Sequence, residues 1–171
     1  MPGSLSHLTR RFFDVVLARP LADSEQQAVK DWLTEQENSL FLAQPAADQR
    51  HGYTAAETVV AAGVKDRVLI RTALLHDIGK RHARLGAIGR VIASLLILFR
   101  IPIRGRWAAY RDHGEVAALE LQAIGSDSLI VDFARQHHGE RPATIDSDTW
   151  ELLQKADQPP KTLARNRPGI S

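Results

Sequence analysis

The sequence predicts an all-α protein, a compact multi-helix bundle with close to ten short helices. Apolar residues recur at the three- and four-residue spacing of amphipathic helices, and no segment alternates as a half-buried strand would. Glycine, proline or a capping residue separates successive helical segments. The chain has 171 residues, 44% of them hydrophobic, which is enough for one core of ordinary size.

The composition excludes several classes of protein. There are no cysteines, so disulfides and thiolate zinc sites are excluded. The longest uninterrupted apolar run, Leu95 to Phe99, is far shorter than the about 20 residues that a membrane span needs. No signal-peptide pattern follows Arg10 and Arg11, so we expect a cytoplasmic protein. The formal net charge of +2 gives no strong nucleic-acid signal.

The N-terminal part of the chain reads as helices without obvious chemistry. Apolar spacing over residues 5–18 predicts a helix that ends before Pro20. A second helix is expected to open at Ser24 as N-cap, with Gln27 three residues on. We therefore expect residues 1–45 to form a helical cap packed on the core.

The rest of the chain divides into a main domain, residues 46–160, and a basic C-terminal tail, residues 161–171, all within one globular unit. Helices are expected in the main domain at residues 47–62, 66–76, 113–125, 128–138 and 146–157. Gly63 is expected to stop the first of them, and Gly79 can end the second.

Residues 81–111 differ from the rest because they contain seven arginines and no acidic residue. An apolar run from Val91 to Phe99 lies in the middle, as a helix broken by Pro102. We expect a buried helix with solvated arginines at its ends. The alternative is a basic, apolar-centred flap over residues 84–106 that meets a phosphate-bearing substrate or makes peripheral contact with a membrane surface.

Histidines and aspartates on separate helices suggest a metal site. Neutral imidazole and carboxylate are both good ligands for divalent first-row metals. Taken singly, each histidine is more often a satisfied core or surface residue, and Asp157 has a salt bridge with lysine or arginine as its alternative. An unpaired carboxylate among Leu153 and Ala156 would be costly, and a metal would remove that cost. The candidate ligands are His51, His76, Asp77, His113, His137, His138 and Asp157.

The order of these residues resembles the HD-domain metal-dependent phosphohydrolase superfamily over about residues 47–158. The resemblance lies in His51 followed by Gly52, then in the stretch Leu74 to Lys80, which reads LLHDIGK, and in a distant aspartate. The additional His113 and the pair His137-His138 are similar to two-metal members such as the HD-GYP group. The sequence after that pair lacks the Gly-Tyr-Pro signature of HD-GYP enzymes. The fold implied is an HD-domain bundle.

The resemblance implies an assignment of ligands. His51, His76, Asp77 and Asp157 would hold one ion, and Asp77 would bridge to a second. His113, His137 and His138 would complete the second site, although one of the adjacent pair can instead donate a proton to the leaving oxygen. One or two divalent ions are expected, from among manganese, iron, magnesium, nickel and cobalt.

The activity implied is hydrolysis of a phosphomonoester or phosphodiester, such as a nucleotide, through attack by a metal-activated hydroxide. Asp77 and Lys80 are the expected catalytic residues. Lys80, Arg81 and Arg111 are expected to bind the phosphorylated small molecule. The alternative is a metal- or nucleotide-binding regulatory module with little turnover. The sequence makes no prediction of oligomeric state.

Overall fold

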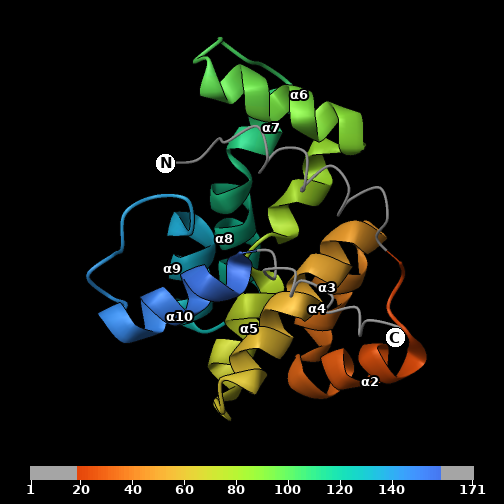
Figure 1. Cartoon of the computed structure of the whole chain (residues 1–171), viewed down its shortest axis with the longest axis vertical. Helices are drawn as coiled ribbons and strands as arrows, with labels where there is room; N and C mark the ends of the chain where they lie inside the picture. The colour runs from red at the N-terminus through yellow and green to blue at the C-terminus, as the bar shows by residue number, and fades with distance from the viewer. Residues whose placement is uncertain (1–18, 159–171) are drawn as a thin grey trace, which may run out of the picture.

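The computed structural model describes residues 19–158, and Figure 1 shows them as a bundle of helices. No strand occurs among these residues, so the predicted all-α class is confirmed. The expected helix at residues 5–18 and the tail at 161–171 lie outside the described residues. The helices are α2 (Asp23–Trp32), α3 (Glu35–Leu42), α4 (Ala46–Ala61), α5 (Arg67–Leu75), the 3₁₀ helix η1 (Ile78–Ala83), α6 (Ala87–Leu98), α7 (Arg106–Arg111), α8 (His113–Ala123), α9 (Ser128–Gln136) and α10 (Ser147–Asp157).

Local capping explains where several helices begin. Asp66 accepts from the backbone N–H of Val68 at 2.8 Å, and Asp146 accepts from that of Thr149 at 2.9 Å. The expected cap at Ser24 is wrong, since this residue lies inside α2. The first residue before α2 is Ala22, whose N–H donates to the Glu25 carboxylate at 2.6 Å. The acidic side chain of the first turn therefore performs the capping.

The main core lies between α4, α5, α8, α9 and α10, and α3 inserts Phe41 into it. The side chains at its centre are fully enclosed and almost all aliphatic or aromatic. They include Leu74, Leu75, Ile78, Leu121, Ile130, Phe133 and Leu153. The division of the chain at residues 45 and 160 stays a prediction.

Two glycines let backbones meet closely beside candidate ligands. A methyl group on Gly52 of α4 would lie 2.6 Å from the carbonyl oxygen of Leu74 in α5. A methyl group on Gly79 would overlap the carbonyl oxygen of His113. The expectation that Gly79 ends a helix is therefore wrong. Gly79 lies inside η1, where α8 crosses it.

The α6–α7 hairpin, residues 87–111, stands at one end of the molecule's long axis (Figure 1). It has a small cluster of its own, in which Ala93 and Tyr110 pack against Ala83 and Leu85. The expectation that the apolar helix is buried is wrong. Several of its largest side chains are exposed, because only its Ala93 face packs against the protein.

One buried polar network links α3 and α5 to the loop before α9. The carboxylate of Glu37, which is 1% exposed, accepts from Arg71 at 2.7 and 2.9 Å. It also accepts from the hydroxyl of Ser126 at 2.8 Å and from the backbone N–H of Thr34 at 3.1 Å. Both oxygens of this buried carboxylate are thus satisfied.

Among the described residues, every helix is too short or too polar to cross a lipid bilayer.

Candidate metal centre

Four helices end at one place in the bundle, and each brings a candidate ligand to it. His76 directly follows α5, His137 directly follows α9, and Asp157 is the last residue of α10. His113 comes two residues after the end of α7 and opens α8. His51 arrives from the second turn of α4. The carboxyl end of a helix carries partial negative charge, so this convergence favours a cation.

The same helix ends fix how three of the histidines point. The Nδ1 atoms of His76, His113 and His137 lie 2.7 to 2.9 Å from the carbonyl oxygen three residues earlier. Those carbonyls belong to last turns, where a helix leaves its oxygens without intrahelical partners. A carbonyl can only accept, so each Nδ1 carries the hydrogen and donates it. In the neutral ring, Nε2 is then left with a free lone pair for a metal.

The ligand atoms gather into two groups that share Asp77. The first group is His51, His76, Asp77 and Asp157, and the second group is Asp77, His113, His137 and His138. Within each group, one ligand atom from every residue lies within 4.8 Å of the others. The two groups are the same sets that the resemblance implied.

The two oxygens of Asp77 face different groups. Its Oδ2 lies 3.5 Å from His76 Nε2 and 3.6 Å from His51 Nε2, and its Oδ1 lies 3.1 Å from His113 Nε2 and 3.3 Å from His137 Nε2. A carboxylate turned in this way can bridge two ions.

Asp157 completes the first group. Its Oδ1 lies 2.9 Å from His51 Nε2 and 3.0 Å from His76 Nε2. The histidine–carboxylate separations at Asp77 and Asp157, which run from 2.9 to 3.6 Å, match those between ligands of one ion. Ligands about 2.1 Å from a metal lie about 3.0 Å apart in an octahedron and about 3.4 Å apart in a tetrahedron.

Hydrogen bonding alone does not satisfy this cluster. Asp77 Oδ1 is buried and has no hydrogen-bond partner of acceptable geometry, although two imidazole nitrogens face it. The Nε2 atoms of His113 and His137 also face each other at 3.3 Å. Because their hydrogens are engaged on Nδ1, both are acceptors, and a cation between them and Asp77 would satisfy all three. The donor set therefore fits a metal ion.

The pKa values of the first group reflect its concentrated negative charge. Burial alone would lower the pKa of His76, but the carboxylates of Asp77 and Asp157 outweigh burial and raise it to about 9. Burial would raise the pKa of Asp157, but the histidines beside it hold the pKa well below its usual range. Both carboxylates stay ionised, so the centre attracts positive charge as a proton or as a metal.

In the second group, the pKa values of two histidines are lowered instead of raised. Burial lowers the pKa of His137. Desolvation and the neighbouring His137 lower the pKa of His138, even though part of His138 reaches the surface. Neutral imidazole is the form that binds metals, and both rings favour it.

The ligands of the centre differ in their exposure to solvent. His76 and His137 are each 1% exposed, whereas His51 is 28% exposed and Asp157 17%. Solvent therefore reaches the centre past His51, Asp157 and His138.

The three basic residues predicted to bind substrate have other contacts. Lys80 is buried and pairs with Asp77 Oδ2. Arg81 donates to the carbonyl of Ile78 at 2.8 Å and to Glu120 at 2.6 Å. Arg111 is exposed and pairs with its neighbour Asp112. Their contact with a phosphate stays a prediction.

One residue pair beside the centre was missed by sequence reasoning. Asp48, one turn before His51, forms a buried bidentate ion pair with Arg90 of α6. Burial would lower the pKa of Arg90, but the Asp48 carboxylate outweighs burial and raises it. The Asp77 carboxylate adds to this rise, so Arg90 lies close to the metal centre. The partners are 42 residues apart, and the helical pattern of either segment gives no signal for the pairing.

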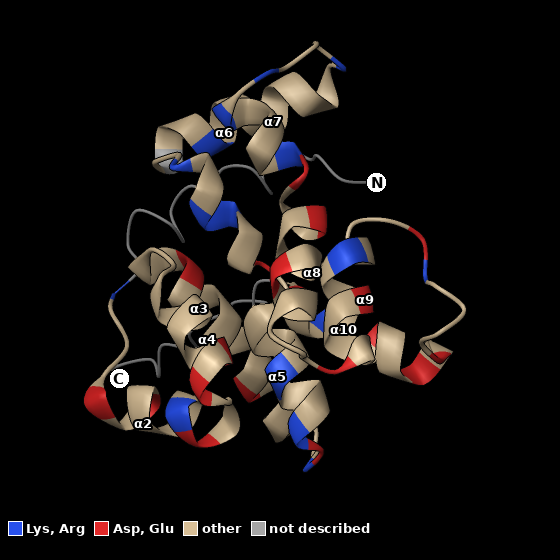
Figure 2. Ribbon diagram, turned by 180° about the vertical axis from the view of Figure 1, so that it is seen from behind, with Lys and Arg blue, Asp and Glu red and all other residues tan. Residues whose placement is uncertain are grey.

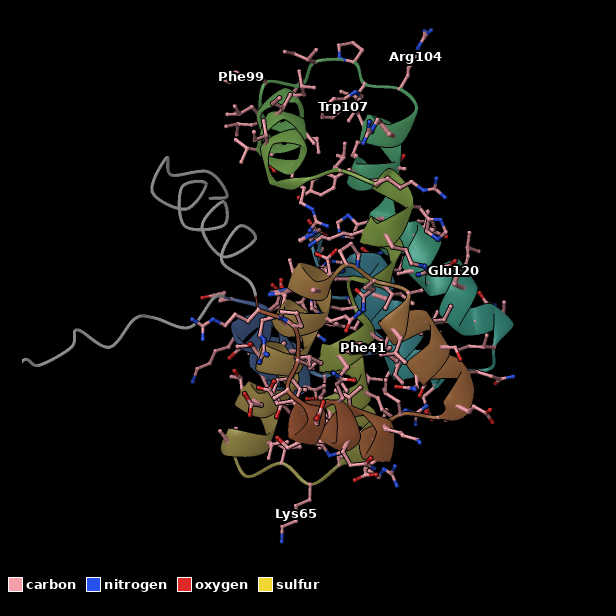
Figure 3. All side chains as sticks on the ribbon, turned by 90° about the vertical axis from the view of Figure 1, so that its right-hand side faces the viewer. Phe41, Lys65, Phe99, Arg104, Trp107 and Glu120 are labelled. Carbon is pink, nitrogen blue, oxygen red and sulfur yellow. The ribbon has the colours of Figure 1, made fainter. Side chains whose placement is uncertain are left out.

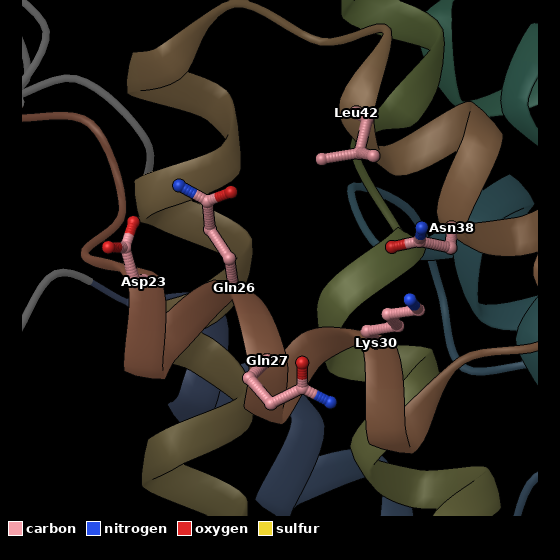
Figure 4. Close-up of a pocket in the computed structure, with 6 residues that line it drawn as sticks. All are labelled: Asp23, Gln26, Gln27, Lys30, Asn38 and Leu42. Atoms are coloured by element: carbon pink, nitrogen blue, oxygen red, sulfur yellow. The ribbon is translucent and has the colours of Figure 1, made fainter.

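A shallow hollow elsewhere on the protein contains none of the candidate ligands. It encloses about 240 Å³ between α2 and α3 and is lined by Asp23, Gln26, Gln27, Lys30, Asn38 and Leu42 (Figure 4). Its lining is mostly polar amides and single charges, without the convergence seen at the metal centre.

Comparisons of the chain with protein-family models, curated proteins and solved structures found no match. The chemistry of the centre is therefore inferred from its own residues: a buried His/Asp cluster, on an all-α scaffold, that is arranged to hold metal ions.

Proposed function

We propose that this protein is a metal-dependent phosphohydrolase of the HD-domain type, acting on a phosphomonoester or phosphodiester such as a nucleotide. The observation that carries the proposal is the orientation of Asp77, whose two oxygens face the two ligand groups. When two ions are bound close together, they lower the pKa of a water between them and clamp the attacking and leaving oxygens of an in-line displacement.

The charge of the loaded centre supports an anionic substrate. Two divalent ions bring four positive charges, and Asp77 and Asp157 offset two of them, while the histidines serve as neutral ligands. Lys80 adds one more positive charge at 5% exposure. The resulting positive excess is opposite in sign to the charge of a phosphate ester and would attract it.

The chain's own residues divide the work. Asp77 and Asp157 hold negative charge against the ions, and the backbone carbonyls behind three histidines fix the rings. We assign Lys80 first to Asp77, whose charge it compensates. Its ammonium would reach a phosphoryl oxygen only by leaving that carboxylate. Arg81 also supports α8 through Glu120, and its predicted contact with a phosphate would require it to leave that carboxylate.

The test is metal content per chain, measured by elemental analysis on protein purified without chelating resin. We expect about two ions in the wild type, none in Asp77→Ala, and one in His113→Ala, because His113 faces only the second group. The matched control is His82→Ala, which removes an exposed histidine that pairs with Glu120 outside both groups and should leave both ions in place.

A screen of phosphoesters with manganese, iron, magnesium, nickel and cobalt follows on the loaded protein. Hydrolysis above a metal-free control, lost in Asp77→Ala, is the expected result. Full metal content and activity in Asp77→Ala would contradict the assignment. Two bound ions without hydrolysis of any phosphoester would instead indicate a regulatory module.

A further inference from the structure

The outer face of α6 and the loop after it carry large apolar side chains that nothing in the described part of the chain covers. Ile88 is 68% exposed and Phe99 69% exposed, and the exposed Ile92 and the half-buried Leu95 lie between them at helical spacing. Further exposed apolar residues continue this surface around the end of the helix. They are Ile97, Leu98 and Ile101. We call this set the α6 face.

Arginines border the α6 face, and no acidic residue interrupts it. The chain has none between Arg81 and Arg111. Figure 2 shows Lys and Arg but no Asp or Glu on the hairpin, and Figure 3 shows Arg104 projecting from its tip, with Phe99 at the same end of the molecule. The exposed arginines from residue 84 to residue 106 are Arg84, Arg100, Arg104 and Arg106. An apolar centre with a cationic border is the pattern of a helix that lies in the interface of an anionic membrane.

The hairpin is held in a fixed place on the protein. Ala93 and Tyr110 anchor its inner side, and Arg106 donates to the backbone carbonyl of Arg84. The buried pair of Arg90 with Asp48 ties α6 to the helix that carries His51. The apolar side chains are thus displayed by an ordered support, and they face away from the core.

We propose that the α6 face docks on an anionic phospholipid bilayer and holds the metal centre at the membrane surface. Charge complementarity favours an anionic bilayer over other partners. In a symmetric contact between two copies, the arginine borders of both chains would face each other and repel. A nucleic acid would meet the arginines but would leave the isoleucines and Phe99 without an apolar partner. In an anionic bilayer, the headgroups would contact the arginines and the acyl chains would contact the apolar side chains.

The experiment is co-sedimentation of the full chain with lipid vesicles, without any phosphoester. Vesicles with about one-third phosphatidylglycerol should bind the protein, vesicles of pure phosphatidylcholine should bind it much less, and high salt should weaken binding. Replacing Arg100 and Arg104 together by glutamine should lower the partition coefficient about 25-fold, from a factor of about five per arginine. Ile88→Ser with Phe99→Ser should also release the protein.

Two matched controls remove comparable groups elsewhere. Lys65→Gln removes a charge at the opposite end of the molecule (Figure 3), and Leu119→Ser removes a side chain that is 56% exposed on α8. Both should bind vesicles as the wild type does. All variants should keep helical circular dichroism and metal content, which shows that they fold.

The proposal is overturned if the wild type does not bind anionic vesicles, or if the arginine and Phe99 variants bind equally well. A dimer in analytical ultracentrifugation that Phe99→Ser dissociates, without vesicle binding, would assign the face to a second copy. Because lipid binding is measured without substrate, its outcome is independent of the proposed hydrolysis.

Discussion

Two buried carboxylates in this protein have opposite surroundings. Glu37 is enclosed by donors, namely the guanidinium of Arg71, the hydroxyl of Ser126 and a backbone N–H. Asp77 pairs with Lys80 and lies beside His76, and otherwise faces further histidine nitrogens and Asp157, with one of its oxygens unsatisfied. Both are almost completely buried, so burial alone does not separate them.

A structural carboxylate and a ligand carboxylate can be distinguished by the groups around them. A carboxylate that stabilises a fold has donors for both oxygens, because an unmet buried acceptor costs stability. A carboxylate that awaits an ion lies among other acceptors, which only a cation can satisfy together. Mutations in the two regions should therefore affect different measurements.

The largest effect is expected for Asp77→Asn. The amide keeps the shape of the side chain but removes the charge that faces both groups. Turnover should fall more than about 1,000-fold. Mutating a residue that only hydrogen-bonds to a metal ligand already lowers activity about 10–100-fold, and Asp77 is itself a candidate ligand. Steady-state kinetics on the best phosphoester, with metal content on the same sample, checks this. Unchanged turnover with two ions bound would place Asp77 among structural carboxylates.

Glu37→Ala should lower stability but leave metal binding unchanged. It leaves Arg71, which is 15% exposed, with only Asp127 as an ionic partner at 2.8 Å. Breaking a buried pair costs about 3–5 kcal/mol of unfolding free energy. Urea denaturation measures the loss, and metal content per folded chain should not change. A loss of ions at unchanged stability would contradict the division between the two regions.

Gly79→Ala tests the packing beneath the centre. The added methyl group would overlap the His113 carbonyl and push η1 away from α8. Overpacking of this kind costs about 1–3 kcal/mol. The displacement should also weaken the second ion more than the first, as seen by titrating the loaded protein with a chelator. Gly86→Ala is the control, because nothing lies within 4 Å of its position.

The smallest expected effect is a dependence of the unfolding free energy on pH, caused by Glu37. Burial raises its pKa, but the hydrogen bonds from Arg71, Thr34 and Ser126 outweigh burial and lower it below 4.5. A depressed pKa in the folded state contributes stability above the unfolded value, and that stability is lost as pH falls through the folded value.

The unfolding free energy of the wild type should therefore approach that of Glu37→Gln as the pH is lowered below 4.5, by at most about 1.4 kcal/mol per pH unit. Urea denaturation curves at several pH values between neutral and acidic conditions check this. A difference that stays constant with pH would mean that Glu37 does not titrate differently on folding.

Much of the fold was accessible from sequence because helix signals are local. Asp66 and Asp146 cap the helices that follow them, and α4 and α9 lie where the apolar spacing predicted. The error at Ser24 is also local, since the Glu25 side chain satisfies the N–H of Ala22 instead. Spacing and caps act within a few residues, so one chain is enough to read them.

The missed features all depend on distant partners. The pairs of Glu37 with Arg71 and of Asp48 with Arg90 join residues 34 and 42 positions apart. The α6 helix is apolar except at Gly89, Arg90 and Ser94, and its pattern does not reveal that the covered side is the one with Arg90 and Ala93. The candidate ligands could be selected because the order of five histidines and two aspartates on separate predicted helices resembles that of HD-domain proteins, and order is visible in one sequence.

The backbone carbonyls that hold His76, His113 and His137 have one further consequence. Each ring takes its direction from its own helix end, three residues back, and not from any connecting segment. The connections are therefore free to vary in length and content while the rings stay oriented. The stretch between Asp77 and α7 uses this freedom, since α6 and the loop after it occupy it, whereas the end of α7 must stay in place to orient His113. New attachment surfaces can be spliced into such a scaffold while its reactive interior stays unchanged.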